Sequence, residues 1–202
     1  MTPNPRWPVA LDGIIESIVT TQGPDGAWNC AALGLRIPTE HTPTQPVRAR
    51  TWGKTRTRKN FERNGYGYIQ FLSDPLVFVE AALNIYESPD PILDESWAWV
   101  EVDVTRHASA NAERPYCSWQ LSPRESNIEN QTVPVINRGF NAIIEMTVLA
   151  SRLDVPTYDN DEIYQELNKL ADIVRTCGGS REQRALSRID TASTWDIELC
   201  ES

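Results

Sequence analysis

A short basic and hydroxyl-rich segment carries the clearest chemistry in this sequence. Between Arg48 and Arg63 there are seven Lys or Arg residues and one acid, Glu62, although the whole chain has a formal net charge of −9. A strand-like run precedes the segment, and a helix-like run ends it at Gly65. Backbone N–H groups at a helix N-terminus, with cationic and hydroxyl side chains beside them, bind phosphate. The segment therefore predicts an anion site, and the alternative from the residues alone is a solvated basic helix.

A second segment indicates what the anion would belong to. Residues 28–34 read Trp-Asn-Cys-Ala-Ala-Leu-Gly, an Asn followed by small side chains. Small side chains let a flat ring approach a strand closely, so that main-chain N–H and C=O groups meet its polar edge. Tight packing against a neighbouring strand would explain the same residues. A flat ring here and a phosphate at the basic segment together describe flavin mononucleotide, FMN.

Hydrolytic and acid–base chemistry has little support. The two histidines, His41 and His107, lie outside any nucleophile motif. Glu101 and Asp103 share one face of a predicted strand, an arrangement that exposed strand faces commonly show. The sequence contains neither a G-x-x-x-x-G-K-[ST] loop nor a G-x-G-x-x-G loop. We therefore expect any redox chemistry to be carried by the cofactor, and the catalytic residues are unknown.

The cysteines do not form a metal or redox motif. Cys30, Cys117, Cys177 and Cys200 are scattered without C-x-x-C spacing. We expect reduced thiols and no metal site.

Composition limits the classes of partner. The chain has 202 residues, of which 40% are hydrophobic and 23% charged, values typical of a globular protein with a sizeable core. A sequence pI near 4.8 disfavours nucleic acid and anionic membranes, so a small anion suits the basic segment better than a polyanion. The sequence shows neither a signal-peptide pattern nor an apolar run of the ~18 residues that a membrane span needs. We expect a cytoplasmic protein.

Hydrophobic periodicity and turn residues predict the elements that position these segments. Strands are predicted at 14–21, 28–37, 47–52, 66–72, 97–104 and 116–121. A helix with the Asp74-Pro75 start signal runs to about Leu83, and residues 87–95 are predicted to be a loop. Six short strands with helices between them favour a small, mainly antiparallel barrel.

The C-terminal part changes to helical periodicity. An amphipathic helix is predicted at 138–153, a second helix from Asp159 to the Cys177-Gly178-Gly179 stop, and a shorter one after it. We therefore expect a barrel domain at 1–130 and a helical subdomain at 131–202.

Over nearly its whole length the chain resembles the flavoprotein-like family of domain of unknown function 447, in the FMN-binding split-barrel superfamily. The resemblance implies a mainly β fold with α: an FMN-binding split β-barrel followed by a small C-terminal helical subdomain. The stretches that carry it are residues 15–21 with 29–34, residues 50–60 with 71–79, and 137–140.

Two motifs of the wider split-barrel flavin proteins have counterparts here. Their second strand often reads Asn-x-Ala-Pro, where this chain has Asn29-Cys-Ala-Ala. Their third-strand loop often reads Lys-Asp-Thr-x-x-Asn, and residues 56–60 preserve Thr-x-x-Asn with Arg56 in place of the Asp. The resemblance implies that Asn29 and the backbone around Ala31 meet the isoalloxazine ring. It also implies that the phosphate and ribityl chain are held by Arg50, Lys54, Thr55, Thr57 and Asn60.

The resemblance extends to assembly and activity. Split barrels of this superfamily are usually homodimers with flavin at the subunit interface, which implies a homodimer here. A flavin-reductase-like oxidoreductase of unknown substrate is the leading interpretation, with a nicotinamide or other electron donor and a link to one-carbon metabolism. The alternatives are a non-catalytic flavin carrier or sensor, or a module that binds an anion or an acidic partner without flavin.

Overall fold

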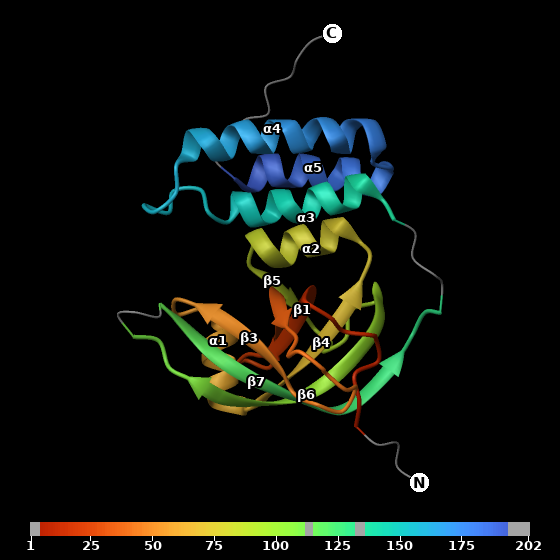
Figure 1. The fold of residues 1–202 in the computed structure, drawn as a ribbon, viewed down its shortest axis with the longest axis vertical. Helices are drawn as coiled ribbons and strands as arrows, with labels where there is room; N and C mark the ends of the chain where they lie inside the picture. Colours follow the sequence, from red (N-terminus) through yellow and green to blue (C-terminus); the bar gives the residue numbers. More distant parts are fainter. Residues whose placement is uncertain (1–4, 112–114, 132–135, 194–202) are drawn as a thin grey trace. The chain divides into compact units, whose positions relative to one another are not determined.

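The computed structural model of the protein describes residues 5–111, 115–131 and 136–193. Contacts divide the chain into two compact units. The barrel unit comprises Met1–Ser73 and Tyr86–Thr132, and the helical unit comprises Asp74–Ile85 and Val133–Ser202. Figure 1 shows the strands of the first unit and the stacked helices of the second.

The barrel unit is a closed antiparallel barrel. Its strands run in the order β1-β4-β6-β7-β3-β2, and pairing of β2 with β1 closes the ring. A short additional strand, β5, pairs with the start of β2. This arrangement confirms the predicted split-barrel fold class. The strand bounds are β1 Ile14–Gln22, β2 Trp28–Arg36, β3 Val47–Trp52, β4 Tyr66–Leu72, β5 Tyr86–Ser88, β6 Ser96–Ala108 and β7 Tyr116–Ile128.

Alternating side chains of these strands fill the barrel. Val100, Val102 and Val104 of β6 point inward at every second position, as the period of a strand requires. Helix α1 (Arg56–Asn64) adds Phe61, which is 2% exposed and packs edge-on against Trp119 with ring centroids 5.4 Å apart. The basic segment is therefore attached to the barrel core through one aromatic side chain.

Two strands are longer than their hydrophobic pattern predicts. β6 continues to Ala108 and β7 to Ile128, and the added residues of β7 are mostly polar and exposed. Their pairing with each other, with register shifts after Glu101 and Arg106, holds them in the sheet. The predicted loop at 87–95 begins inside β5, because that strand is defined by its pairing to β2 and has no apolar pattern of its own.

The helical unit contains four helices, α2 (Pro75–Leu83), α3 (Arg138–Ala150), α4 (Asn160–Cys177) and α5 (Ser180–Ala192). Their buried faces meet in one core that includes Val79, Ile143, Leu167 and Ile189. As predicted, Asp74 caps α2, and its carboxylate accepts a hydrogen bond from the Leu76 N–H at 2.9 Å. The sequence boundary after residue 130 leaves α2 with the barrel, whereas its contacts group it with the C-terminal helices.

Among the described helices, none combines the length and apolar character that crossing a membrane requires.

Two glycines set the closest approach within the helical unit, and this contact yields a stability prediction. A Cβ at Gly139 of α3 would lie 2.6 Å from Gly178 Cα and 2.8 Å from Gly178 N, both backbone atoms. Ala gains about 1 kcal/mol of helix propensity over Gly, but overpacking against backbone costs about 1–3 kcal/mol or more. We expect Gly139→Ala to lower the free energy of unfolding by roughly 2 kcal/mol in urea titrations.

The matched control is Gly34→Ala, where the nearest heavy atoms to the new Cβ are the Glu16 carboxylate oxygens at 3.6 and 3.8 Å. This variant should unfold at the wild-type urea concentration. Equal stability of the two variants would show that the contact between the glycines does not limit the packing of α3 against the end of α4.

Candidate functional site

The loop that leads into α1 follows from local backbone chemistry. Gly53 turns the chain after β3 with a φ of 60°, in the left-handed region that favours glycine. Thr55 is the N-cap of α1, and its Oγ1 accepts a hydrogen bond from the Arg58 N–H at 3.2 Å. The helix ends at Gly65, whose φ is 68° and whose N–H bonds to the Phe61 carbonyl. The first turn contains no acid, so the positive end of the helix dipole is not neutralised from within the helix.

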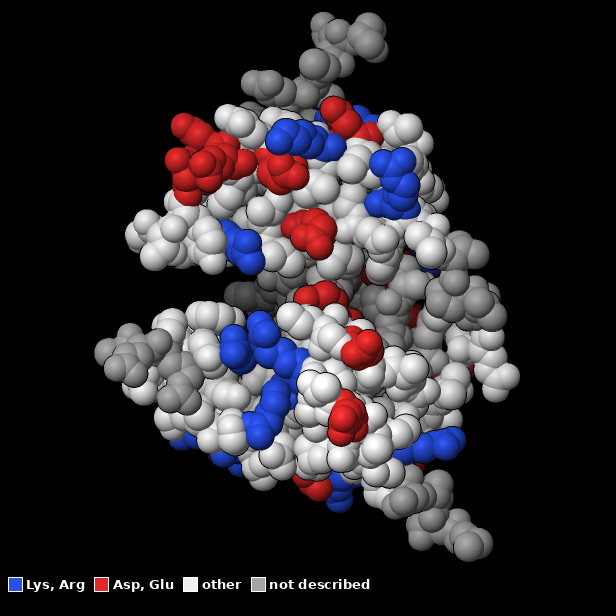
Figure 2. Space-filling view, in the orientation of Figure 1, with Lys and Arg blue, Asp and Glu red and all other residues white. Residues whose placement is uncertain are grey.

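Several cations surround this helix end, and they differ in what they contact. Arg58 donates to the Gly53 carbonyl at 3.0 Å and to Glu62 at 3.1 Å. The Arg50 guanidinium lies 4.2 Å from the centre of the Tyr116 ring. Lys54 is exposed and forms no hydrogen bond or ion pair with any described residue. Figure 2 shows Lys and Arg side chains gathered over the β3 and β7 region of the barrel unit. Lys54 is thus a cation that can bind an anion without giving up a partner.

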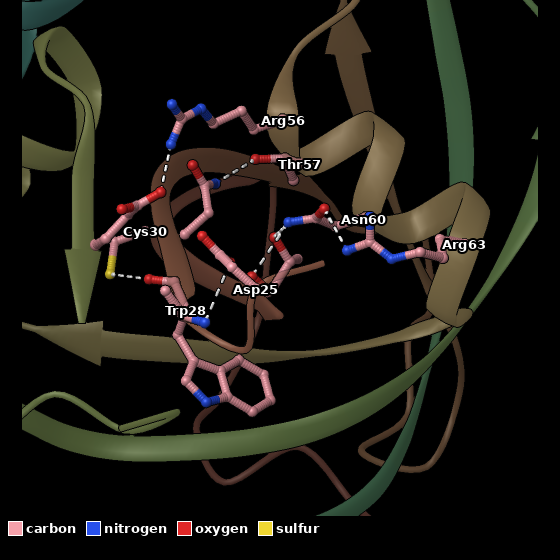
Figure 3. A network of polar contacts seen from close by, with 11 residues as sticks. Asp25, Trp28, Cys30, Arg56, Thr57, Asn60 and Arg63 are labelled. Atoms are coloured by element: carbon pink, nitrogen blue, oxygen red, sulfur yellow. Dashed lines mark hydrogen bonds and ion pairs between the residues drawn. The ribbon is translucent and has the colours of Figure 1, made fainter. Parts of the chain in front are cut away.

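A buried polar network holds α1 against the first two strands (Figure 3). Asn29 Nδ2 donates to Thr57 Oγ1 at 3.3 Å. Asn60 Nδ2 donates to the carbonyl of Thr21 at 3.2 Å and to its hydroxyl at 3.0 Å. Asn29, Thr57 and Asn60 are all less than 9% exposed. The structure therefore brings together the two predicted motifs, the Asn of β2 and the Thr-x-x-Asn of α1.

These bonds give the motif residues a positioning role within the fold. The amide of Asn60 is used in bonds to β1, and its Oδ1 accepts from Arg63 Nη2 at 2.8 Å. Arg63 Nη2 also donates to the Gln22 carbonyl at 2.6 Å. Sequence reasoning did not single out Arg63, although its i+3 spacing from Asn60 places both on one helix face.

The middle of β2 has an open edge toward β3. Its residues 31–34 pair with β1 on one side. On the other side β5 pairs with residues 28–30, and β3 pairs only with Leu35 and Arg36. Within the described pairings, residues 31–34 therefore lack a strand partner on that edge. Their main-chain polar groups can bond to solvent or to a ligand. The Ala31 side chain packs against the barrel core, leaving its backbone as the part that faces this edge.

An acid that sequence reasoning missed lies beside this site. Glu87 of β5 is opposite Asn29 in the strand register and forms an ion pair with Arg56, the first residue of α1. Only the pairing of β5 with β2 brings Glu87 to α1, so no local pattern could have identified it.

The nearby thiol is not a nucleophile. Cys30 is buried, and this burial, followed by the negative charge of Glu87, raises the pKa of its thiol to about 12 against a weaker opposing hydrogen bond from the Ser88 backbone. The thiol therefore stays protonated at neutral pH. Cys30, Cys117 and Cys177 are free, and Cys200 lies outside the described residues. No cluster of three or more potential metal ligands exists in the described part of the chain.

The paired carboxylates Glu101 and Asp103 are not an acid–base pair. Both contact Arg124, with N–O distances of 3.0 Å and 3.6 Å. Next to them, Tyr68 packs edge-on against Trp28 and Trp99. Burial, then the charge of Glu101 and smaller contributions, raises the pKa of Tyr68, so its hydroxyl also stays protonated. The groups that surround the site can bind and orient a ligand but offer no evident base.

Known structures share this fold. An FMN-bound protein from Methanosarcina mazei, described with the family model DUF447, superimposes with a TM-score of 0.76 at 23% identity, covering 90% of this chain and 96% of that one. Component B of nitrilotriacetate monooxygenase from Bacillus cereus gives 0.46 at 14% identity, covering 66% and 74%. The styrene monooxygenase flavin reductase from Pseudomonas putida gives 0.42 at 12%, covering 58% and 80%. No curated protein sequence matches this chain significantly.

Two family models match the sequence itself. The N-terminal domain of the protein of unknown function DUF447 matches residues 15–149, and the second DUF447 model matches residues 137–191. Because these matches span most of the sequence, the chain belongs to the DUF447 family of proteins of unknown function.

Proposed function

We propose that this protein binds FMN at the start of α1 and acts as a flavin-reductase-like oxidoreductase. The observation that carries the proposal is the open edge of β2 at residues 31–34 beside the unneutralised N-terminal end of α1. A flat heterocycle with a polar rim fits free main-chain groups, and a phosphate fits a helix N-terminus with cations. The FMN named for the family member from Methanosarcina mazei supports the same ligand.

The residues divide into those that would touch the ligand and those that position the site. Lys54 and the first-turn N–H groups of α1 would hold the phosphate, with Arg50 and Thr55 beside them. The backbone around Ala31 would meet the ring. Asn29, Thr57 and Asn60 keep α1 in place through their mutual and β1 contacts. FMN would supply the transfer of hydride or single electrons, while the protein contributes orientation and electrostatics.

The electron donor and substrate follow from the resemblance alone. A nicotinamide donor and a link to one-carbon metabolism are therefore proposals about the reaction and do not follow from the geometry. Steady-state oxidation of NADH or NADPH by the FMN-loaded protein separates an oxidoreductase from a flavin carrier or sensor.

An absorbance spectrum is the direct test of the cofactor. After addition of FMN and removal of the excess, the protein should retain absorbance bands near ~370 and ~450 nm, as an enzyme whose chemistry is carried by a bound flavin must. A colourless protein that retains no FMN would reject the proposal and favour the alternative of an anion-binding or partner-binding module.

Charge reversal at Lys54 tests the phosphate position. We expect Lys54→Glu to weaken FMN binding by about 10- to 100-fold, or roughly 1.4–2.8 kcal/mol, because it replaces attraction by repulsion at the phosphate. Riboflavin, which lacks the phosphate, should bind with unchanged affinity. Lys169→Glu, with the same charge change in the helical unit, is the control. Equal effects of Lys54→Glu on both flavins would place the phosphate elsewhere.

We further propose a homodimer with flavin at the subunit interface, on the basis of the family resemblance. Multi-angle light scattering of the FMN-loaded protein should give twice the 22.8 kDa chain mass. A monomer that retains FMN would mean that one chain supplies the whole site.

A further inference from the structure

The ion pair between Arg56 and Glu87 places a negative charge at the edge of the anion site. Arg56 is the first residue of α1 and follows the N-cap Thr55 directly. Its Nη1 donates to Glu87 Oε1, and Figure 3 shows this contact reaching from α1 to the strand beside Cys30. A guanidinium at this position is also the natural partner for a phosphate held by the helix N-terminus.

The fold fixes Glu87 in this position. Three successive pairs in the strand register, Trp28 with Ser88, Asn29 with Glu87 and Cys30 with Tyr86, hold β5 on β2. Glu87 therefore lies opposite the same Asn29 that bonds to Thr57 of α1. Its negative charge contributes to the raised pKa of Cys30, which shows that its field reaches β2.

The pair is accessible and exchangeable. The Arg56 and Glu87 side chains are 51% and 41% exposed, so water screens their attraction and the pair contributes little to stability. The other acid of the basic segment, Glu62, is already shared by Arg58 and Arg106. Glu87 is thus the acid that competes for a cation at the N-terminal end of α1.

We propose that Glu87 is a specificity-determining residue of this site, which competes with a bound phosphate for Arg56 and so limits the affinity for phosphate-bearing flavin. The inference rests on the proposed function. A phosphate monoester carries a charge of about −1.5 to −2 at neutral pH, so its approach is opposed by Glu87 and favoured by Arg56. A neutral flavin feels neither effect. The site would then hold FMN loosely enough for exchange with solution.

Titration of FMN and riboflavin into four proteins tests this inference: wild type, Glu87→Gln, Arg56→Gln and the double variant. We expect Glu87→Gln to lower the Kd for FMN by about tenfold, equivalent to about 1.4 kcal/mol, and to leave the Kd for riboflavin unchanged. In the Arg56→Gln background the same substitution should change the Kd for FMN by less than about threefold, because the competition acts through Arg56.

The control is Asp90→Asn, an exposed acid just beyond β5 that makes the same change in net charge. It should leave both affinities at the wild-type value. Unchanged or weaker FMN binding by Glu87→Gln, an equal gain for riboflavin, or an equal gain from Asp90→Asn would each overturn the inference while FMN binding by the wild type stands. Failure of the wild type to bind FMN would instead reject the proposed function and this inference with it.

Discussion

The placement of α1 depends on the requirement that buried polar groups be hydrogen-bonded. Its buried face consists of Thr57, Asn60 and Phe61, of which only Phe61 is apolar. A buried amide left without partners costs about 1–3 kcal/mol, comparable to the gain from burying one aromatic side chain. The helix is therefore stable where Asn60 reaches Thr21 and Thr57 reaches Asn29. Those same bonds fix the helix N-terminus beside β2.

One departure of the chain from regular pairing creates the rest of the candidate site. After Ala49, β3 leaves β2 and continues only along β7, up to Trp52. The middle of β2 is thereby left open on that edge, and the chain turns at Gly53 into α1. The free backbone edge and the positive helix end are therefore two consequences of one event. Small residues at 31, 32 and 34 keep this edge accessible, because larger side chains would extend over the neighbouring backbone.

The elements with strong local signals could be predicted from the sequence, and the contacts between distant segments could not. The Asp74-Pro75 start of α2 and the Gly65 end of α1 are set by backbone chemistry within a few residues, and both are confirmed. The ion pair of Glu87 depends on a three-residue strand whose only definition is its register with β2. The Thr-x-x-Asn spacing likewise places two polar side chains on one helix face. It does not determine whether they bond to a ligand or, as Asn60 does, to the neighbouring strand.

Charge in the basic segment is divided between folding and binding. Arg58 is paired with Glu62, Arg63 bonds to a carbonyl and an amide, and Arg50 lies over an aromatic ring. A cation that must give up such a partner contributes less to ligand affinity than one that is already free in solvent, so Lys54 carries more weight than its neighbours. Because charges are screened over about 8 Å at physiological ionic strength, the distant acids behind the net charge of −9 act weakly on a ligand in contact with this segment. An acidic protein can therefore select a small anion through local charge, while its overall charge disfavours longer polyanions that would extend beyond the segment.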